Sequence, residues 1–65
     1  MKKYELTDEI GYYFGRPLHR IRAVRDFGTV KAGDLGGFIE SEQNLSHEGE
    51  AWVSGNARVY GNALV

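Results

Sequence analysis

The chain has 65 residues, nine glycines, one proline, no cysteine and a formal net charge of −1. A chain of this length forms one domain, the missing cysteines exclude a disulfide framework, and the near-neutral charge argues against a simple nucleic-acid binder. Because no apolar run is long enough for a signal peptide or a membrane span, we expect a cytoplasmic protein without membrane contact.

The first half of the chain predicts strands joined by tight turns. Residues 3–6 alternate polar and apolar side chains, which is typical of a short strand, and residues 7–9 then indicate a turn or a helix cap. The aromatic run at residues 12–14 meets Gly15 and a proline, which predicts a hairpin turn before a return strand at residues 18–24. A helix remains an alternative for residues 18–24, since their apolar positions also fit helical spacing.

A glycine-rich stretch follows at residues 33–37, where we expect a compact loop before Phe38 resumes a strand. Its spacing matches neither the P-loop nor the dinucleotide-binding fingerprint, so phosphate binding is not expected. Residues 41–46 fit either one helical turn or an irregular loop.

The last third of the chain, residues 49–65, is a hexapeptide repeat. Its columns are Gly49, Gly55 and Gly61; Ala51, Ala57 and Ala63; Val53, Val59 and Val65; with Asn56 and Asn62 after the last two glycines. Alanine and valine are expected to point inward on short strands, while the Gly-Asn pairs form the corners. Repeats of this kind bury their inner face only against stacked neighbours, so the tail must pack on the preceding strands or on another chain.

These elements predict a mainly β fold, with an α+β fold containing one short helix as the alternative. We expect a single domain over residues 1–65. It consists of a small antiparallel β part at residues 1–48 and a hexapeptide-repeat β segment at residues 49–65.

The charges are unevenly spread along the chain. The basic strip comprises Arg16, Arg20, Arg22, Arg25 and Lys31, and the acidic strip comprises Asp34, Glu40, Glu42, Glu48 and Glu50. Each strip could bind a partner of opposite sign, and internal salt bridges on a solvated surface are the equal alternative. On one strand face, Glu40 and Glu42 would lie about 6.6 to 6.8 Å apart, which matches every second phosphate of a DNA strand.

The residues do not predict catalysis or metal binding. His19 and His47 lie far apart without further ligands at zinc spacing, and there is no G-x-S-x-G nucleophile elbow. Trp52, Tyr60 and the aromatic run at residues 12–14 are expected to fill a small core rather than to stack on bases. We therefore expect no cofactor, no metal and no enzymatic activity.

Six stretches resemble a group of phage and prophage proteins that are often labelled transferases. They are residues 3–7, 18–23, 26–28, 33–40, 44–46 and 55–63. In these proteins a small β domain precedes long arrays of G-N-A-x-V repeats, so the resemblance implies a β domain joined to a β-helix. In size and character the chain also resembles small phage inhibitors of host defence, including anti-CRISPR proteins of type I (I-C) systems.

The first hypothesis for function is a phage-encoded inhibitor in the cytoplasm of a host bacterium. It would bind a host protein, a CRISPR effector (Cascade) subunit at its DNA-binding surface, by using the acidic strip as a DNA mimic, without tight nucleic-acid binding of its own. The alternative is a structural cap or oligomerisation module of a β-helix repeat protein. A weak nucleic-acid binder that uses the basic strip is a third possibility. We expect a monomer or a small homo-oligomer.

Overall fold

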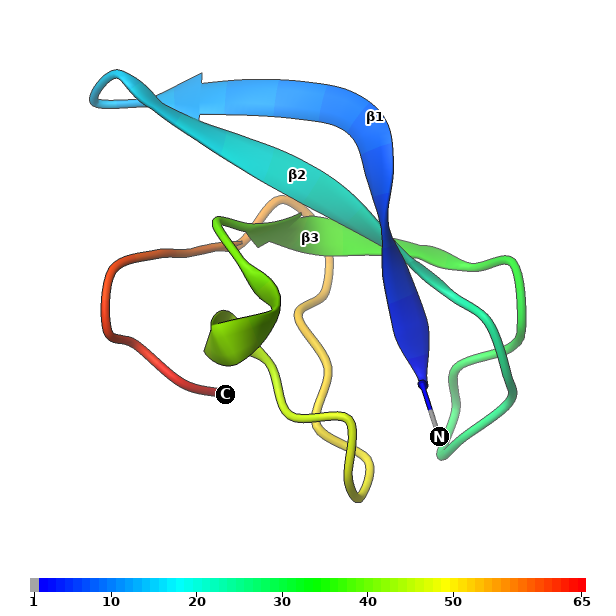
Figure 1. Cartoon of the computed structure of the whole chain (residues 1–65). Helices are drawn as coiled ribbons and strands as arrows, with labels where there is room; N and C mark the ends of the chain where they lie inside the picture. The colour runs from blue at the N-terminus through cyan, green and yellow to red at the C-terminus, as the bar shows by residue number, and fades with distance from the viewer. Residues whose placement is uncertain (1) are drawn as a thin grey trace.

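The computed structural model describes residues 2–65 and shows one mixed, four-stranded sheet (Figure 1). The strands are β1 (Tyr4–Tyr13), β2 (Arg16–Ala23), β3 (Leu35–Ile39) and β4 (Arg58–Val59), and they lie in this order across the sheet. β1, β2 and β3 pair antiparallel in turn, whereas β3 and β4 pair parallel. The predicted mainly β fold is confirmed. Helical structure within residues 2–65 is limited to one 3₁₀ turn, η1 (Glu42–Asn44).

The N-terminal hairpin forms where the sequence predicts it. Phe14 and Gly15 both have positive φ, 51° and 78°, and Tyr13 pairs with Arg16 across the turn. This is the geometry of a two-residue type I′ turn, whose twist matches that of the flanking strands. The alternative helix at residues 18–24 is wrong, because that stretch forms most of β2.

The first strand is longer than predicted. The turn expected at residues 7–9 is a bulge inside β1, where the pairing shifts between Leu6 and Ile10. Figure 1 shows a sharp bend in the ribbon of β1. A bulge adds residues to one strand and bends it without ending the pairing. Residues 7–9 therefore resemble a turn in sequence but lie within one continuous strand.

The core lies between the sheet and the C-terminal half of the chain. Its buried members are Tyr4, Ile21, Ile39, Leu45 and Val53. Of the aromatic side chains expected to fill it, Trp52 packs against the core, whereas Tyr12 and Phe14 lie outside and are 75% and 85% exposed on the N-terminal hairpin. The opposite face of that hairpin is covered by the C-terminal tail, since the rings of Tyr13 and Tyr60 lie 5.3 Å apart between centroids.

Two glycines let the C-terminal tail approach β3. The loop predicted over residues 33–37 ends early, because Gly36 and Gly37 already belong to β3. A Cβ atom on Gly36 would lie 2.5 Å from the carbonyl oxygen of Val53, and one on Gly37 would lie 2.6 Å from that of Ala57. Any side chain here would push the two backbones apart, so these glycines serve close packing rather than a turn.

The repeat tail stacks on the segment before it. We call residues 35–46 coil 1 and residues 53–65 coil 2. Hydrogen bonds follow their whole length: from the N–H of Gly37 to Val53 O (2.6 Å), of Phe38 to Ala57 O (2.9 Å), of Glu40 to Val59 O (3.1 Å) and of Val65 to Asn44 O (2.9 Å). Parallel coils at strand spacing are the stacking pattern of a β-helix, so the tail packs on the preceding strands, as one of the two predicted arrangements requires.

The repeat columns differ in burial along coil 2. The corner glycines Gly49, Gly55 and Gly61 all have positive φ, as predicted. Val53 is buried, Val59 is half-buried and Val65 is 43% exposed. In the alanine column, Ala51 packs against the core as expected, whereas Ala57 and Ala63 are exposed. Inner faces are covered only where a neighbouring coil or strand lies against them.

Candidate functional site

The acidic strip does not form one row of carboxylates. Glu40 follows β3 and Glu42 begins η1, so the expected placement on one strand face is wrong. The side chain of Asn44 accepts hydrogen bonds from the backbone N–H groups of Glu40 and Ser41 and turns the chain out of the sheet. Asp34 lies before β3 and accepts a hydrogen bond from the N–H of Lys31.

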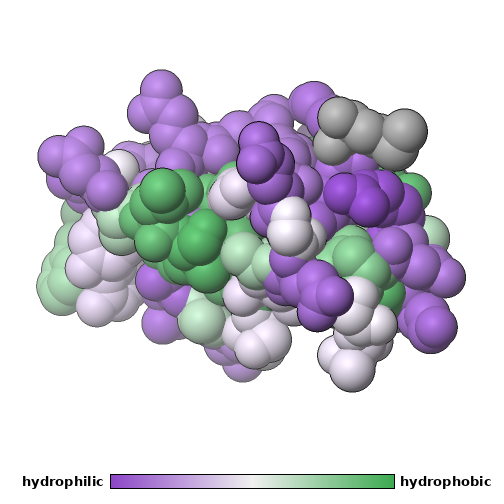
Figure 2. Space-filling model, turned by 90° about the horizontal axis from the view of Figure 1, so that it is seen from below, coloured by the Kyte–Doolittle hydropathy of each residue, from purple (hydrophilic) through white to green (hydrophobic). Residues whose placement is uncertain are grey.

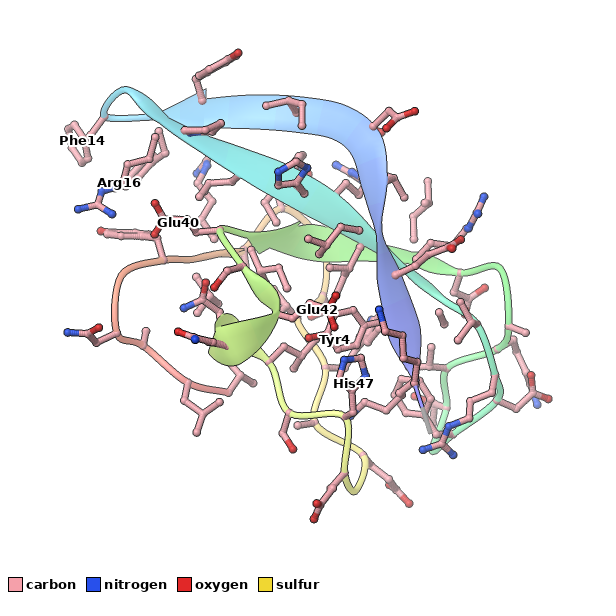
Figure 3. All side chains as sticks on the ribbon, in the orientation of Figure 1. Tyr4, Phe14, Arg16, Glu40, Glu42 and His47 are labelled. Atoms are coloured by element: carbon pink, nitrogen blue, oxygen red, sulfur yellow. The ribbon has the colours of Figure 1, made fainter. Side chains whose placement is uncertain are left out.

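Glu40 connects the hairpin to both coils. Arg16 Nη1 lies 3.1 Å from each of its carboxylate oxygens, and the backbone N–H of Gly61 in coil 2 donates to Oε1 at 2.8 Å. These contacts, led by the Gly61 hydrogen bond, hold the pKa of Glu40 below its ordinary value. Figure 3 shows Arg16 and Glu40 facing each other near the hairpin turn.

Glu42 belongs to a second polar cluster, which connects η1 to the N-terminal residue Lys2 and to His47. Its carboxylate lies 2.9 Å from His47 Nε2 and 3.1 Å from Lys2 Nζ, and these hydrogen bonds lower its pKa. The ring of His47 stacks on Tyr4 with centroids 4.1 Å apart (Figure 3). The Tyr4 hydroxyl donates to Leu45 O at 2.7 Å, and burial raises its pKa to about 12.

His47 has no free ring nitrogen in this arrangement. Its Nδ1 accepts a hydrogen bond from the backbone N–H of Lys3 at 3.0 Å, so the ring proton lies on Nε2, which faces Glu42. A general base needs a lone pair that can accept a proton from substrate. His47 therefore acts here as a structural connector between the N-terminus and coil 1.

Glu48 and Glu50 complete the acidic strip, and both are exposed in the turn between the two coils. The geometry thus divides the strip into two carboxylates that connect distant segments, Glu40 and Glu42, and three exposed ones that do not, Asp34, Glu48 and Glu50. Several arginines of the basic strip are likewise paired, in the ion pairs Arg16–Glu40, Arg20–Glu9 and Arg22–Glu5. Partner binding by the acidic strip stays a prediction.

Asn44 joins coil 1 to coil 2, a role that sequence reasoning missed. It is fully buried, and its Nδ2 donates to the carbonyl oxygens of Gly61 (3.2 Å) and Ala63 (2.8 Å). Its Oδ1 accepts from two backbone N–H groups of coil 1, so both ends of the amide are used. An isolated asparagine in a polar stretch resembles a loop residue, and no local signal distinguishes it.

Lys3 is a second buried polar residue that sequence reasoning missed. Its Nζ donates to Ala51 O at 2.6 Å and lies 4.8 Å from the ring centre of Phe27. Burial, with a smaller contribution from Arg25, lowers its pKa. This lysine binds the start of the chain to the segment that leads into coil 2.

The free edge of coil 2 is the most open part of the stack. The carbonyl groups of Ala57 and Val59 face coil 1, so the N–H and C=O of Arg58 between them face the opposite edge. The large apolar residues of coil 2 that remain exposed are Tyr60, Leu64 and Val65. Figure 2 shows apolar surface interrupted by hydrophilic side chains on the lower side of the molecule.

Within residues 2–65 no group of three histidine, cysteine or acidic side chains is placed to hold a metal ion. The same residues contain no helix of the length and apolar character that a bilayer crossing requires.

The fold and the stacked coils define a small β domain that ends in a hexapeptide-repeat stack of β-helix type. No protein-family model matches the chain. The chain is similar to the uncharacterized acetyltransferase YdcK of Escherichia coli (strain K12), with 34% identity over 74 residues. The similarity covers all of this chain but only 23% of the relative.

This similarity contradicts the expectation that the chain is not an enzyme, since the relative is named as an acetyltransferase. The expectation rested on the lack of a local catalytic motif. A catalytic site can collect its residues from segments far apart in sequence, and a search for local motifs does not detect such a site.

Proposed function

We propose that the chain is the capping module of a hexapeptide-repeat β-helix in a protein of acetyltransferase type. In this role the hairpin closes one end of the stack, and coil 2 offers its free edge to a further coil of the same repeat. The observation that carries the proposal is the parallel stacking of coil 2 on coil 1, with hydrogen bonds from Gly37 to Val65.

The order of the strands supports growth in one direction. β2 pairs with β3 on one side, so the hairpin occupies the edge of coil 1 that a preceding coil would otherwise use. β4 pairs with β3 on the other side and has an open outer edge. Terminal units of repeat proteins differ from the internal units in this way, because they protect the end of the stack.

The exposure of coil 2 supports a further coil on its open edge. Leu64 and Val65 are 70% and 43% exposed, although Val65 stands in the column whose first member, Val53, is buried. Covering one such side chain fully stabilises a protein by about 1.5 to 3 kcal/mol. A further coil in register would cover this column.

The proposal of acetyl transfer rests on the name of the relative, which is an acetyltransferase. The chain spans 23% of that protein's length, so we assign the reaction to the assembled protein and assign to this module the start and the register of its coil stack. A cap of this kind sets where the first coil begins and how the later coils align, and the catalytic site of the assembled protein would lie among those later coils.

The inhibitor hypothesis, its phage origin and the cytoplasmic location stay predictions. The structure changes how the acidic strip should be tested. Because Glu40 and Glu42 form internal ion pairs, their reversal would disturb the fold as well as any partner contact. Reversal of the exposed pair Glu48 and Glu50 separates the two effects.

The capping proposal is tested by extending the chain after Val65 with one tyrosine, which completes the repeat that starts at Gly61, and then with three repeats of the Gly55–Tyr60 sequence. We expect a higher melting temperature and slower amide exchange at Arg58, whose N–H would gain a partner. The matched control is the same extension with aspartate at each valine of the added repeats, which cannot be buried. An added segment that stays unfolded in both versions, with an unchanged melting temperature, would refute the capping role.

A further inference from the structure

β1 forms the other edge of the sheet, opposite β4. In a two-residue hairpin, the residues that flank the turn form a hydrogen-bonded pair, and such pairs alternate along the strands. Tyr13 and Gly11 therefore direct their N–H and C=O groups toward β2. The same groups of Ile10 and Tyr12 face the free edge of the sheet.

The side chains along this edge also have two distinct faces. Gly11 faces the coils, because a Cβ atom there would lie 3.2 Å from the Phe38 ring. Ile10 and Tyr12 point to the opposite face, where they are 37% and 75% exposed. The part of β1 next to the turn thus combines unpaired backbone groups with uncovered apolar side chains.

Protection against strand pairing is confined to the other half of β1. Edge strands are usually protected by bulges and charged side chains. In β1 the bulge and the charged residues Asp8 and Glu9 all precede Ile10. Residues 10–14 contain no charge. We call residues 10–13 the distal edge.

We propose that the distal edge pairs with the distal edge of a second copy of this chain, antiparallel and with two-fold symmetry about Gly11. In this register Ile10 of one copy lies opposite Tyr12 of the other, and each pair exchanges two backbone hydrogen bonds. A β-branched residue opposite an aromatic one is a favourable cross-strand pair. Gly11 lies opposite its own equivalent, where no side chains can collide.

The charges near the distal edge favour a second copy as the occupant. Glu9, which pairs with Arg20, precedes the edge. Arg16, which pairs with Glu40, lies across the turn on the next strand. The side chains of Glu9 and Arg16 stay 56% and 50% exposed in these pairs. Antiparallel pairing brings the end that carries Glu9 in one copy toward the end that carries Arg16 in the other, so charges of opposite sign approach at both ends. The uncharged centre brings no like charges together.

This pairing goes beyond the proposed capping function and does not depend on it. The capping proposal concerns the β4 edge, whereas the dimer uses the β1 edge on the far side of the sheet. A coil stack that grows from coil 2 leaves the distal edge free.

Sedimentation velocity over a concentration series tests the dimer. We expect the wild-type chain to dimerise as its concentration rises. Tyr12→Pro removes an N–H that faces solvent in the monomer, and an edge strand tolerates proline at such a position. The variant should weaken the dimer at least tenfold. Arg58→Pro removes the corresponding outward N–H at the β4 edge, together with the guanidinium over the Tyr13 ring, and should leave the dimer unchanged because the backbone groups of Tyr13 face β2. Circular dichroism of both variants establishes that the monomer still folds.

Cross-linking tests the register without proline. The 65 residues contain no cysteine, so single cysteines can be placed at will. A mixture of the Ile10→Cys and Tyr12→Cys chains should form a disulfide dimer, since directly opposite residues have Cα atoms about 5.5 Å apart. Each variant alone should not, because its cysteines would lie about two residues, or roughly 7 Å, out of step along the strands.

The results that would overturn the proposal are distinct. A wild-type chain that stays monomeric up to millimolar concentration excludes the dimer. Loss of the dimer in Arg58→Pro but not in Tyr12→Pro would assign self-association to the β4 edge. Equal cross-linking in the mixture and in each single variant would show contact without the proposed register.

Discussion

Phe14 has a left-handed backbone conformation, which glycine, asparagine and aspartate adopt more readily than phenylalanine. It is the first central residue of the type I′ turn, with φ of 51°, and its side chain is 85% exposed. Residues other than glycine, asparagine and aspartate enter this left-handed region at a cost of about 1 kcal/mol or more. Its ring contacts Tyr13 at 4.4 Å between centroids, which offsets part of that cost.

Phe14→Asn should therefore stabilise the protein. Asn-Gly is the preferred pair for a type I′ turn, so we expect a gain of up to about 1 kcal/mol in the free energy of unfolding. Thermal unfolding measures the change. Tyr12→Asn is the control, because it removes a similarly exposed ring from an ordinary strand position and should not stabilise. A loss of stability in both variants would show that the aromatic contacts outweigh the turn geometry.

At the scale of elements, the two coils are joined by backbone hydrogen bonds and by one buried amide. Asn44 donates to two carbonyl groups of coil 2 and accepts from two N–H groups of coil 1. A buried group that uses both its donors and its acceptors is costly to replace, since each substitution leaves partners unsatisfied.

Asn44→Asp should separate the coils while changing the side-chain shape little. The new oxygen would face the carbonyl groups of Gly61 and Ala63, where the amide donated before, and a buried charge would lack a partner. We expect a loss of roughly 2 to 4 kcal/mol in urea unfolding, with faster amide exchange at Val65. Asn62→Asp, at an exposed corner, is the matched control and should change stability by less than about 0.5 kcal/mol. Similar losses in the two variants would show that Asn44 does not join the coils.

At the scale of the whole molecule, two carboxylates connect segments far apart in the chain. Glu40 joins the hairpin to coil 2, and Glu42 joins η1 to Lys2 and His47. The pKa of both carboxyls is lowered from the ordinary value of 4.5 in the folded state. Their contribution is therefore fully present above the ordinary pKa and is lost as the pH falls through the lowered values.

Acid should consequently weaken the fold. We expect the free energy of unfolding, measured in urea, to decrease as the pH is lowered below about 4.5, the range in which carboxyls of the unfolded chain take up protons. Glu40→Gln combined with Glu42→Gln should lower stability at neutral pH and make the acid dependence shallower. A double variant with the same acid dependence as the wild type would show that other groups govern acid unfolding.

Local sequence patterns were sufficient for the elements whose geometry depends on neighbouring residues. Gly15 in the hairpin turn and the corner glycines Gly49, Gly55 and Gly61 all have the positive φ that their positions predict, whereas that of Phe14 was not predicted. The repeat period also predicted that the tail must stack on a neighbour. These features depend on backbone conformation over a few residues, so the sequence by itself determined them.

Contacts between distant segments decided the rest, including most of the candidate site. Gly36 and Gly37 were expected in a loop but permit the approach of Val53 and Ala57, and Asn44 gave no local signal of its burial. The acidic strip was expected as a row, yet Glu40 and Glu42 diverge where the chain leaves the sheet. Which side chains meet across a fold depends on how its elements pack, and that packing is a property of the whole tertiary structure.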